Sequence, residues 1–225
     1  MKLSVIIPLY NEVNTIGILI QKVNSVPISK EIIIVDDCST DGSREFIQNL
    51  NAENIIIACH EKNMGKGFAI RTGLKYVTGE IIIIQDADLE YDPNDYPALI
   101  KPIINEETKV VFGNRYHPGN NMYLSKFKIA VLLLTKLANW LYGINITDEA
   151  TCYKVFHKEI FESISLNCKR FEFCPEVIAK VSKAGFSITE IPINYNARSI
   201  DDGKKIRFKD GIEAFYILLK YRFIN

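Results

Sequence analysis

The stretch Ile81-Ile82-Ile83-Ile84-Gln85-Asp86-Ala87-Asp88 decides the fold class of this chain. Its consecutive isoleucines predict a strand that is buried on both faces, as in a parallel sheet covered by helices. The strand delivers two carboxylates, Asp86 and Asp88, to its C-terminal end, the edge where open α/β sheets bind ligands. Neighbouring carboxylates repel each other and are costly to desolvate. They therefore indicate either a bound cation or a pair of solvated turn acids.

Other strands are expected to end at the same edge. Glu31-Ile32-Ile33-Ile34-Val35-Asp36-Asp37 repeats the acidic pattern, and a strand over Leu3–Ile7 leads into Pro8-Leu9-Tyr10-Asn11-Glu12. Helical patterns over 13–23 and 65–77 separate these strands. We therefore predict an α/β fold with a mostly parallel central sheet and helices on both faces. Carboxylates without a nearby histidine or cysteine suit Mg²⁺ or Mn²⁺, which commonly take phosphates as further ligands.

Composition narrows the possible functions. With 225 residues the chain is long enough for one large domain, and its formal net charge of zero predicts no nucleic-acid surface. Five cysteines lack a CxxC pair and a zinc-like spacing to the three histidines, which indicates reduced thiols in a cytosolic protein. The chain enters a strand at Leu3 without an apolar leader, and no apolar run is long enough to span a bilayer. Neither a signal peptide nor a membrane span is therefore expected.

Two segments combine basic and apolar residues at helical spacing. Between Leu124 and Tyr142, lysines interrupt a strongly apolar run that ends near Trp140. This composition fits an amphipathic helix in a membrane interface, and an ordinary core or dimer helix is the alternative. The stretch Gly211–Phe223 has a similar character. The oligomeric state is not determined by these patterns, and a homo-oligomer stays open.

Six motifs, taken together and in order, resemble family 2 glycosyltransferases with the GT-A fold. The motifs lie at Ser4–Glu12, Val35–Ser43, Asn63–Gly67, Asp86–Leu89, Gly113–Tyr116 and Arg198–Lys205. The resemblance is strongest to dolichol- and undecaprenyl-phosphate sugar synthases, such as the dolichol-phosphate mannosyltransferase type. It implies a single GT-A domain over residues 1–225. Residues from 1 to about 115 would bind the nucleotide sugar, and the remainder would form the acceptor side.

The resemblance also implies a reaction and a place for it. A hexose would move, with inversion, from a donor of the GDP-mannose or UDP-glucose type to a polyprenyl phosphate. The enzyme would work in the cytoplasm as a peripheral protein at the cytosolic face of a membrane, in cell-envelope biogenesis. A divalent ion at the donor diphosphate would neutralise the charge that develops on the leaving group.

Roles follow for individual positions of this sequence. The expected nucleotide-sugar residues are Pro8, Tyr10, Glu12, Asp36, Asp37, Lys66, Asp86, Ala87 and Asp88, with Asp37 accepting a hydrogen bond from the base. The metal ligands would be Asp86 and Asp88. Glu90 is a candidate third ligand, at a position where the lipid-phosphate branch commonly has glutamine. For Lys66, an ordinary surface lysine at a helix start is the alternative.

The acceptor determines what else the site needs. A lipid phosphate is already anionic and needs cations, for which the candidates are Arg115, Arg198, Lys204 and Lys205, with a solvated basic surface as the alternative. A hydroxyl of a glycan or another acceptor would need a carboxylate base. Asp148 and Glu149 are the first candidates for that base, followed by Glu172 and Glu176. The predicted catalytic residues are therefore Asp88, Arg115 and Asp148.

Two other enzyme classes fit the sequence less well. A sugar nucleotidyltransferase is expected to carry a glycine- and basic-rich phosphate loop after its first strand, where this chain has Pro8-Leu9-Tyr10-Asn11. A dinucleotide oxidoreductase is disfavoured because no GxGxxG motif follows that strand.

Overall fold

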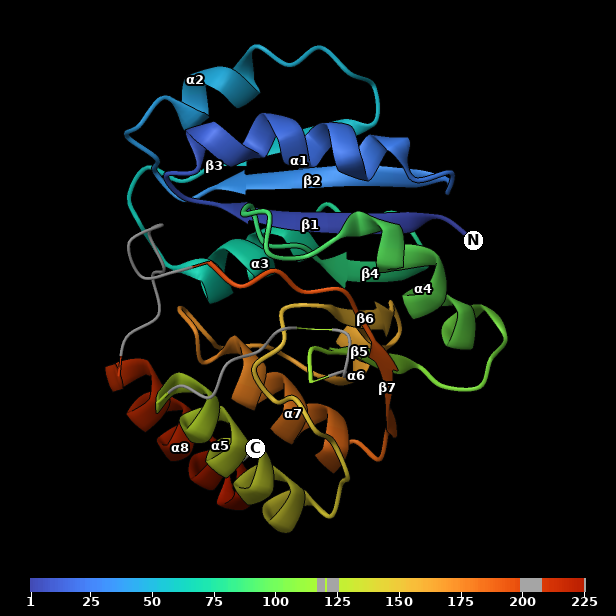
Figure 1. The fold of residues 1–225 in the computed structure, drawn as a ribbon, viewed down its shortest axis with the longest axis vertical. Helices are drawn as coiled ribbons and strands as arrows, with labels where there is room; N and C mark the ends of the chain where they lie inside the picture. The colour runs from blue at the N-terminus through green and yellow to red at the C-terminus, as the bar shows by residue number, and fades with distance from the viewer. Residues whose placement is uncertain (117–119, 121–125, 199–207, 225) are drawn as a thin grey trace.

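The centre of the computed structural model is a seven-stranded sheet with the order β3-β2-β1-β4-β6-β5-β7 (Figure 1). The structure describes residues 1–116, 120, 126–198 and 208–224. The strands are β1 (Leu3–Leu9), β2 (Lys30–Asp36), β3 (Ile55–Cys59), β4 (Ile81–Ile84), β5 (Val110–Asn114), β6 (Lys154–His157) and β7 (Ile188–Pro192). β6 runs antiparallel to β4 and β5, and the other pairings are parallel. The predicted mostly parallel sheet is confirmed.

The helices alternate with the strands as the sequence predicts. They are α1 (Val13–Ser25), α2 (Ser43–Gln48), α3 (Lys66–Leu74), α4 (Tyr96–Ile104), α5 (Lys126–Tyr142), α6 (Ile160–Ser163), α7 (Phe173–Lys183) and α8 (Phe208–Phe223), with a 3₁₀ turn η1 at Pro93–Asp95. In α1 the buried residues are Ile16, Leu19, Ile20 and Val23, the spacing of one helical face. The helices predicted over 13–23 and 65–77 are confirmed, and their ends differ by a few residues.

The strand order places the candidate site. From β1 the chain steps outward to β2 and β3, and then crosses to the other side of β1 to form β4. Right-handed crossovers put α1 and α3 on opposite faces of the sheet, and α3 packs against β1 and β2. The order reverses between β1 and β4, which is the switch point where open α/β sheets bind ligands. Glu12 and Asp86 follow these two strands and therefore meet at one edge.

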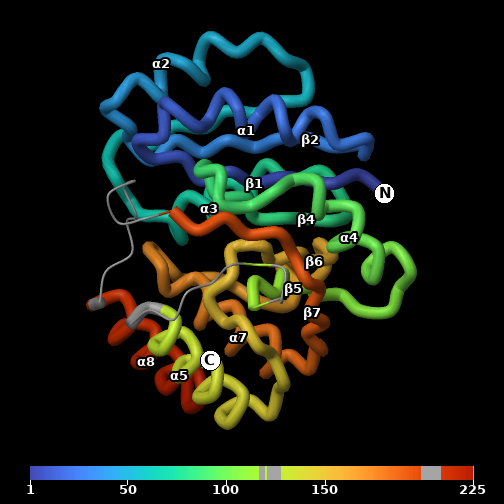
Figure 2. Tube along the Cα trace, viewed as in Figure 1, coloured from blue at the N-terminus to red at the C-terminus, as the bar shows by residue number. Residues whose placement is uncertain are grey.

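The C-terminal half adds a helical layer below the sheet. α5 and α8 lie side by side, and both contact α7 (Figures 1 and 2). The helices predicted at Leu124–Tyr142 and Gly211–Phe223 are confirmed over the described residues, while residues 124–125 lie outside them. No helix in this described part of the chain is long and apolar enough to cross a membrane.

Candidate active site

Asp86 and Asp88 extend from the end of β4, and each has a basic partner. The Lys66 Nζ lies 2.5 Å from the Asp86 Oδ1, and the Arg198 Nη2 lies 2.8 Å from the Asp88 Oδ2. Burial disfavours ionisation of Asp86, but the Lys66 ammonium outweighs burial and holds the Asp86 pKa below its ordinary value. Asp88 behaves differently. Burial and then the carboxylates of Asp86 and Glu90 raise its pKa to about 7.

Arg198 connects the ends of two strands. Its guanidinium donates to both carboxylate oxygens of Glu12, at 3.1 Å each, as well as to Asp88. Its backbone N–H donates to Glu90, whose other carboxylate oxygen accepts from the Tyr195 hydroxyl at 2.9 Å. Arg198 therefore contacts acids that were predicted to bind the donor, although the sequence predicted a contact with the acceptor phosphate. Its phosphate-binding role stays a prediction.

We call these six side chains the charged cluster: Glu12, Lys66, Asp86, Asp88, Glu90 and Arg198. Four carboxylates face two cations, so the cluster carries two negative charges in excess when every group is ionised. That excess matches the charge of one Mg²⁺ or Mn²⁺, and carboxylate oxygens are the donors these ions prefer. The cluster therefore suits such an ion in its net charge and in the type of its ligand atoms. The described residues contain no preformed group of three metal-ligating side chains. Glu90 as a third ligand stays a prediction.

A buried amide supports the acidic strand end from beneath, and sequence reasoning missed it. The Gln85 Nε2 donates to the backbone oxygen of Asp86 at 3.0 Å. The Gln85 Oε1 accepts from the hydroxyls of Tyr96 and Tyr153, at 2.6 and 2.7 Å. Gln85 is completely buried, so this network fixes the backbone from which Asp86 extends. The available signal was a polar amide directly after the apolar strand Ile81–Ile84.

The two acids at the end of β2 have different partners. Asp36 is held by Arg44, whose Nε donates to it at 2.7 Å. Asp37 accepts from the backbone N–H groups of Met64 and Gly65 and contacts the His60 Nδ1, each at 2.7 Å. Arg44 therefore holds the Asp36 carboxylate in place, and the roles of Asp36 and Asp37 at the nucleotide stay predictions. His60 is a neighbour of Asp37 that the sequence did not reveal.

Gly65 shapes the turn that faces Asp37. Its φ is +93°, and a Cβ at this position would meet the Lys169 carbonyl oxygen at 2.4 Å. A side chain is therefore excluded both by backbone conformation and by space. Glycine here allows two successive N–H groups to point at the Asp37 carboxylate.

Arg115 and Asp148, both candidates for the acceptor side, form a buried ion pair. The Arg115 Nε and Nη2 donate to the two carboxylate oxygens of Asp148, both at 2.7 Å. Asp148 is fully buried and Arg115 is only 9% exposed. The sequence predicted Arg115 on the acceptor phosphate and Asp148 as a base, and it did not predict that the two would hold each other. Both carboxylate oxygens of Asp148 are therefore engaged by one guanidinium.

The other candidate bases are also engaged or enclosed. Glu172 accepts from the N–H groups of Lys169 and Arg170, and Glu176 pairs with Lys180 at 2.5 Å. Glu149 is buried, and none of the described residues forms a hydrogen bond with its Oε1. Burial, opposed by Lys154 and reinforced by Asp148, raises the Glu149 pKa to about 7.

The remaining predicted residues lie at the edges of the site. Pro8 is half-buried near the end of β1, and Tyr10 follows that strand with 37% of its surface exposed. The Ala87 carbonyl oxygen accepts from the Thr15 hydroxyl at 2.9 Å, which ties the β4 end to α1. Lys204 and Lys205 lie outside the described residues. The roles of all these positions stay predictions.

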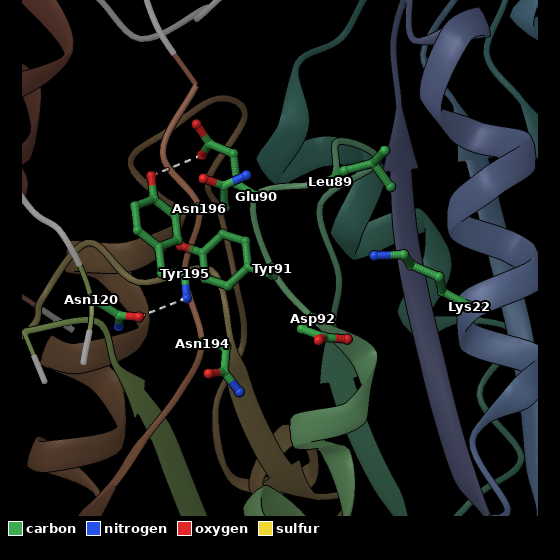
Figure 3. Close-up of a pocket in the computed structure, with 9 residues that line it drawn as sticks. All are labelled: Lys22, Leu89, Glu90, Tyr91, Asp92, Asn120, Asn194, Tyr195 and Asn196. Atoms are coloured by element: carbon green, nitrogen blue, oxygen red, sulfur yellow. Dashed lines mark hydrogen bonds between the residues drawn. The ribbon is translucent and has the colours of Figure 1, made fainter.

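A polar pocket of about 270 Å³ lies beside the charged cluster, with Glu90 in its wall. Figure 3 shows the Tyr195 hydroxyl turned toward Glu90, the Tyr91 ring beside Tyr195, and Lys22 across the pocket. Asp86 is not among the lining residues. The pocket is therefore next to the charged cluster and does not enclose it.

Comparison with known proteins identifies the family. The sequence model described as glycosyl transferase family 2 matches residues 4–165, most of the chain. The chain belongs to glycosyl transferase family 2. It is therefore a glycosyltransferase, in agreement with the resemblance seen in its motifs.

Several characterised glycosyltransferases are similar along the chain. It is 33% identical to a UDP-N-acetylglucosamine–dolichyl-phosphate N-acetylglucosaminyltransferase of Methanococcus voltae, over 95% of this chain and 93% of that protein. It is 28% identical to a dolichol-phosphate mannosyltransferase of Pyrococcus furiosus, over 91% of this chain, and spans 59% of that protein. A dodecaprenyl-phosphate galacturonate synthase of Rhizobium johnstonii is 25% identical over 88% of this chain and 60% of its own length.

Solved structures confirm the GT-A fold of this glycosyltransferase. Glucosyl-3-phosphoglycerate synthase of Mycobacterium tuberculosis, in complex with Mn²⁺, uridine diphosphate and its product, has a TM-score of 0.76 at 18% identity. The match covers 100% of this chain and 81% of that one. Mannosyl-3-phosphoglycerate synthase of Rubrobacter xylanophilus has a TM-score of 0.77 at 17% identity, covering 98% and 72% of the two chains. Identities this low show the fold alone.

Proposed function

We propose that this glycosyltransferase moves a hexose, with inversion and with a divalent metal, from a nucleotide sugar to a polyprenyl phosphate. Residues from 1 to about 115 bind the donor, and residues from about 116 to 225 form the acceptor side. The similarity to the Methanococcus voltae enzyme over nearly the whole length of both chains supports a lipid-phosphate acceptor. The relatives name different sugars, which leaves the transferred sugar open.

The observation that carries the choice of acceptor is the state of Asp148. A hydroxyl acceptor needs a base to remove its proton, and Asp148 was the first candidate. Its two carboxylate oxygens are occupied by Arg115 inside a buried pair. A phosphate monoester is already anionic and needs no base. Its oxygen can therefore attack the donor while Asp148 is engaged by Arg115.

The chemistry follows from the edge where β1 and β4 end. An oxygen of the acceptor phosphate attacks the anomeric carbon from the face opposite the leaving group, and the bond from that carbon to the donor diphosphate breaks. Asp86 and Asp88 are the residues that would hold a divalent cation, which when bound would supply Lewis acidity to neutralise the leaving diphosphate. Lys66, at 2.5 Å from Asp86, adds a further positive charge near the same place. The predicted task of Arg198 is to position the acceptor phosphate.

A matched pair of acceptors tests the proposal directly. A short polyprenyl phosphate and the polyprenol of the same length differ only in the phosphate. We expect transfer to the phosphate and none to the alcohol, measured by release of nucleoside diphosphate and by mass of the lipid product. Transfer to the alcohol at a comparable rate would replace this proposal with a hydroxyl acceptor, for which Glu149 is the remaining candidate base.

Arg198→Ala tests the cation assigned to the acceptor. Loss of a charge-assisted contact is expected to lower the efficiency of transfer to the lipid phosphate by about ten- to a hundredfold. Hydrolysis of the donor in water should fall less, because water needs no phosphate-binding cation. Arg71→Ala is the matched control, because the Arg71 guanidinium donates to the backbone oxygens of Asn167 and Cys168 and not to the acids of the cluster. An equal loss in transfer and hydrolysis would place Arg198 at the donor only.

The outer faces of α5 and α8 support attachment to a membrane surface. In α5 the exposed apolar residues are Ile129, Leu132, Leu133 and Trp140, and in α8 they are Ile212, Phe215, Tyr216 and Phe223. In each helix these residues recur at the spacing of one face, and the two helices are neighbours. Basic residues lie on the same helices, including the exposed Lys136 and Arg222. This arrangement suits an anionic lipid surface on the cytosolic side.

Substitutions on α5 test the membrane surface. Leu133 and Trp140 are 63% and 79% exposed, so replacing either with glutamate should leave the fold intact. We expect roughly tenfold weaker sedimentation with vesicles that contain anionic lipid, and unchanged hydrolysis of the donor. Tyr76→Glu, an exposed aromatic position outside both helices, is the control. Unchanged vesicle binding in the α5 variants would contradict the assignment of this face.

A further inference from the structure

The hydrogen bonds around Asp37 bear on which nucleobase the donor carries. This step rests on the proposed function and on the expected contact between Asp37 and the base. An ionised carboxylate offers about four acceptor positions, two on each oxygen. In this structure the Asp37 Oδ1 faces both the His60 Nδ1 and the Met64 N–H. Among the described residues, the Asp37 Oδ2 accepts from the Gly65 N–H alone.

The His60 ring completes the occupation of Oδ1. An unprotonated Nδ1 would put two lone pairs 2.7 Å apart, so the ring proton lies on Nδ1 and is donated to Asp37. The Nε2 then accepts from the Thr72 hydroxyl, at 2.9 Å. The ring also stands edge-on to Phe68, with 5.3 Å between the centroids. His60 is thus held on three sides with its donor aimed at Asp37.

The described residues thus leave one acceptor position of Asp37 for a ligand, on Oδ2. Asp37 is only 3% exposed, which also limits a ligand to a small part of the carboxylate. The Met64 and Gly65 N–H groups are oriented toward Asp37 by the turn in which Gly65 has a positive φ and lies close to the Lys169 carbonyl oxygen. The base contact is therefore restricted to a single donor.

We propose that Asp37, with its Oδ1 filled by His60 and Met64, selects a uridine donor over a guanosine donor. Uracil presents one N–H, flanked by carbonyl oxygens, and this single donor matches the single open position. Guanine presents two adjacent donors, N1–H and the 2-amino group, which pair with both oxygens of a free carboxylate. At this site one guanine donor would be left without a partner. Cytosine presents an unprotonated N3 at the position of the uracil N–H, and its lone pair would face the carboxylate.

The expected preference is substantial. A buried donor without a partner, or a lone pair facing a carboxylate, weakens binding by about ten- to a hundredfold. UDP should therefore bind that much more tightly than GDP or CDP. The diphosphate and the metal are the same in all three ligands, so their contribution cancels in the ratios.

The experiment is titration calorimetry of the full chain with UDP, GDP and CDP in the presence of Mn²⁺. We expect UDP to be the tightest by at least about tenfold. CDP separates hydrogen bonding from size, because a pocket that selects pyrimidines by size would bind UDP and CDP equally. Equal affinities for UDP and CDP, or tighter binding of GDP, would overturn the inference and leave the proposed function standing. If none of the three binds, the proposed function fails as well.

Variants at His60 test the cause of the preference. His60→Ala opens a second acceptor position on Asp37, so the ratio of UDP to GDP affinity should fall by about tenfold. His60→Asn keeps an N–H donor near the place of Nδ1 and should retain the ratio. His157→Ala, at the opposite end of the sheet beside Glu159, is the matched control. An unchanged ratio in a folded His60→Ala protein would remove His60 from the mechanism of selection. If that variant does not fold, the affinities of the unmodified chain for UDP, GDP and CDP still test the proposal.

Discussion

The proposed donor side and the proposed acceptor side of this glycosyltransferase use the same kinds of side chain in opposite ways. On the donor side, Arg198 is shared between Glu12 and Asp88 within a cluster of four carboxyl groups and two cations. On the acceptor side, Arg115 and Asp148 neutralise each other completely in a bidentate pair. Both arginines were expected to bind one phosphate, yet only Arg198 lies in a cluster whose charge is unbalanced.

The difference shows that a buried charged group can either be available to a ligand or be fully engaged by one partner. A carboxylate with excess negative neighbours, such as Asp88, gains when a cation binds beside it. A closed pair such as Arg115–Asp148 loses when either partner is removed, because the other charge is then left buried. We therefore expect the charged cluster to be stabilised by a bound cation. We expect the Arg115–Asp148 pair to stabilise the fold. Three substitution experiments test this contrast.

Removing Arg115 should have the largest effect on stability. Arg115→Ala leaves the Asp148 carboxylate buried and unpaired, so we expect the free energy of unfolding in urea to fall by about 3–5 kcal/mol. Asp148→Ala should cost a similar amount, and the double variant should cost less than the two added together. Arg198→Ala is the comparison on the donor side, with an expected loss of no more than about 1 kcal/mol. If Arg115→Ala and Arg198→Ala lowered the free energy of unfolding equally, the proposed difference between the two sides would be wrong.

Asp88→Asn should have the largest effect on activity. A neutral amide is a poorer ligand for a hard cation, so transfer should fall by at least about a hundredfold at moderate Mn²⁺ concentration. Binding of UDP should also lose its dependence on the metal. Asp92→Asn is the control, since Asp92 caps the η1 turn by accepting from the Asn94 N–H. Near-normal turnover in Asp88→Asn would rule out its role at the metal.

Glu149→Gln should produce a smaller effect that depends on pH. The folded-state pKa of Glu149 is raised to about 7, above its ordinary value, so the native state holds a proton that the unfolded state releases. The stability of the unmodified protein should therefore fall as pH rises from about 4.5 through 7. Glutamine stays neutral, and the variant should become more stable than the unmodified protein above pH 7, on the order of 1–2 kcal/mol. Urea unfolding at pH 5 and pH 8 measures the difference. Parallel pH profiles would show that Glu149 is ionised at little cost.

The fold was largely predictable because its signals are local. Runs such as Ile81–Ile84 bury both faces of a strand, and the helical spacing of α1 places its apolar residues on one side. Strand ends and helix ends differ from prediction by a few residues, because the last turn or pair of an element depends on what packs against it. The two antiparallel pairings of β6 were not predicted, since strand neighbours in a sheet are set by contacts between distant segments.

The sequence by itself determined which chemical groups reach the binding edge. Asp36, Asp37, Asp86 and Asp88 follow strands whose period and direction are local properties, and a parallel arrangement necessarily brings those ends together. The order of the motifs was enough to indicate the family. Residue type and position along a strand suffice for such statements, because neither depends on the rest of the chain.

Only the tertiary structure decided which of these groups hold one another. Arg115 meets Asp148 across 33 residues, and Arg198 meets Asp88 across 110. His60 reaches Asp37 and Gln85 supports Asp86 through contacts that no spacing rule encodes. Whether a charge is available or neutralised depends on the distance to its partners and on the water excluded around them. Those quantities arise only when distant segments pack together.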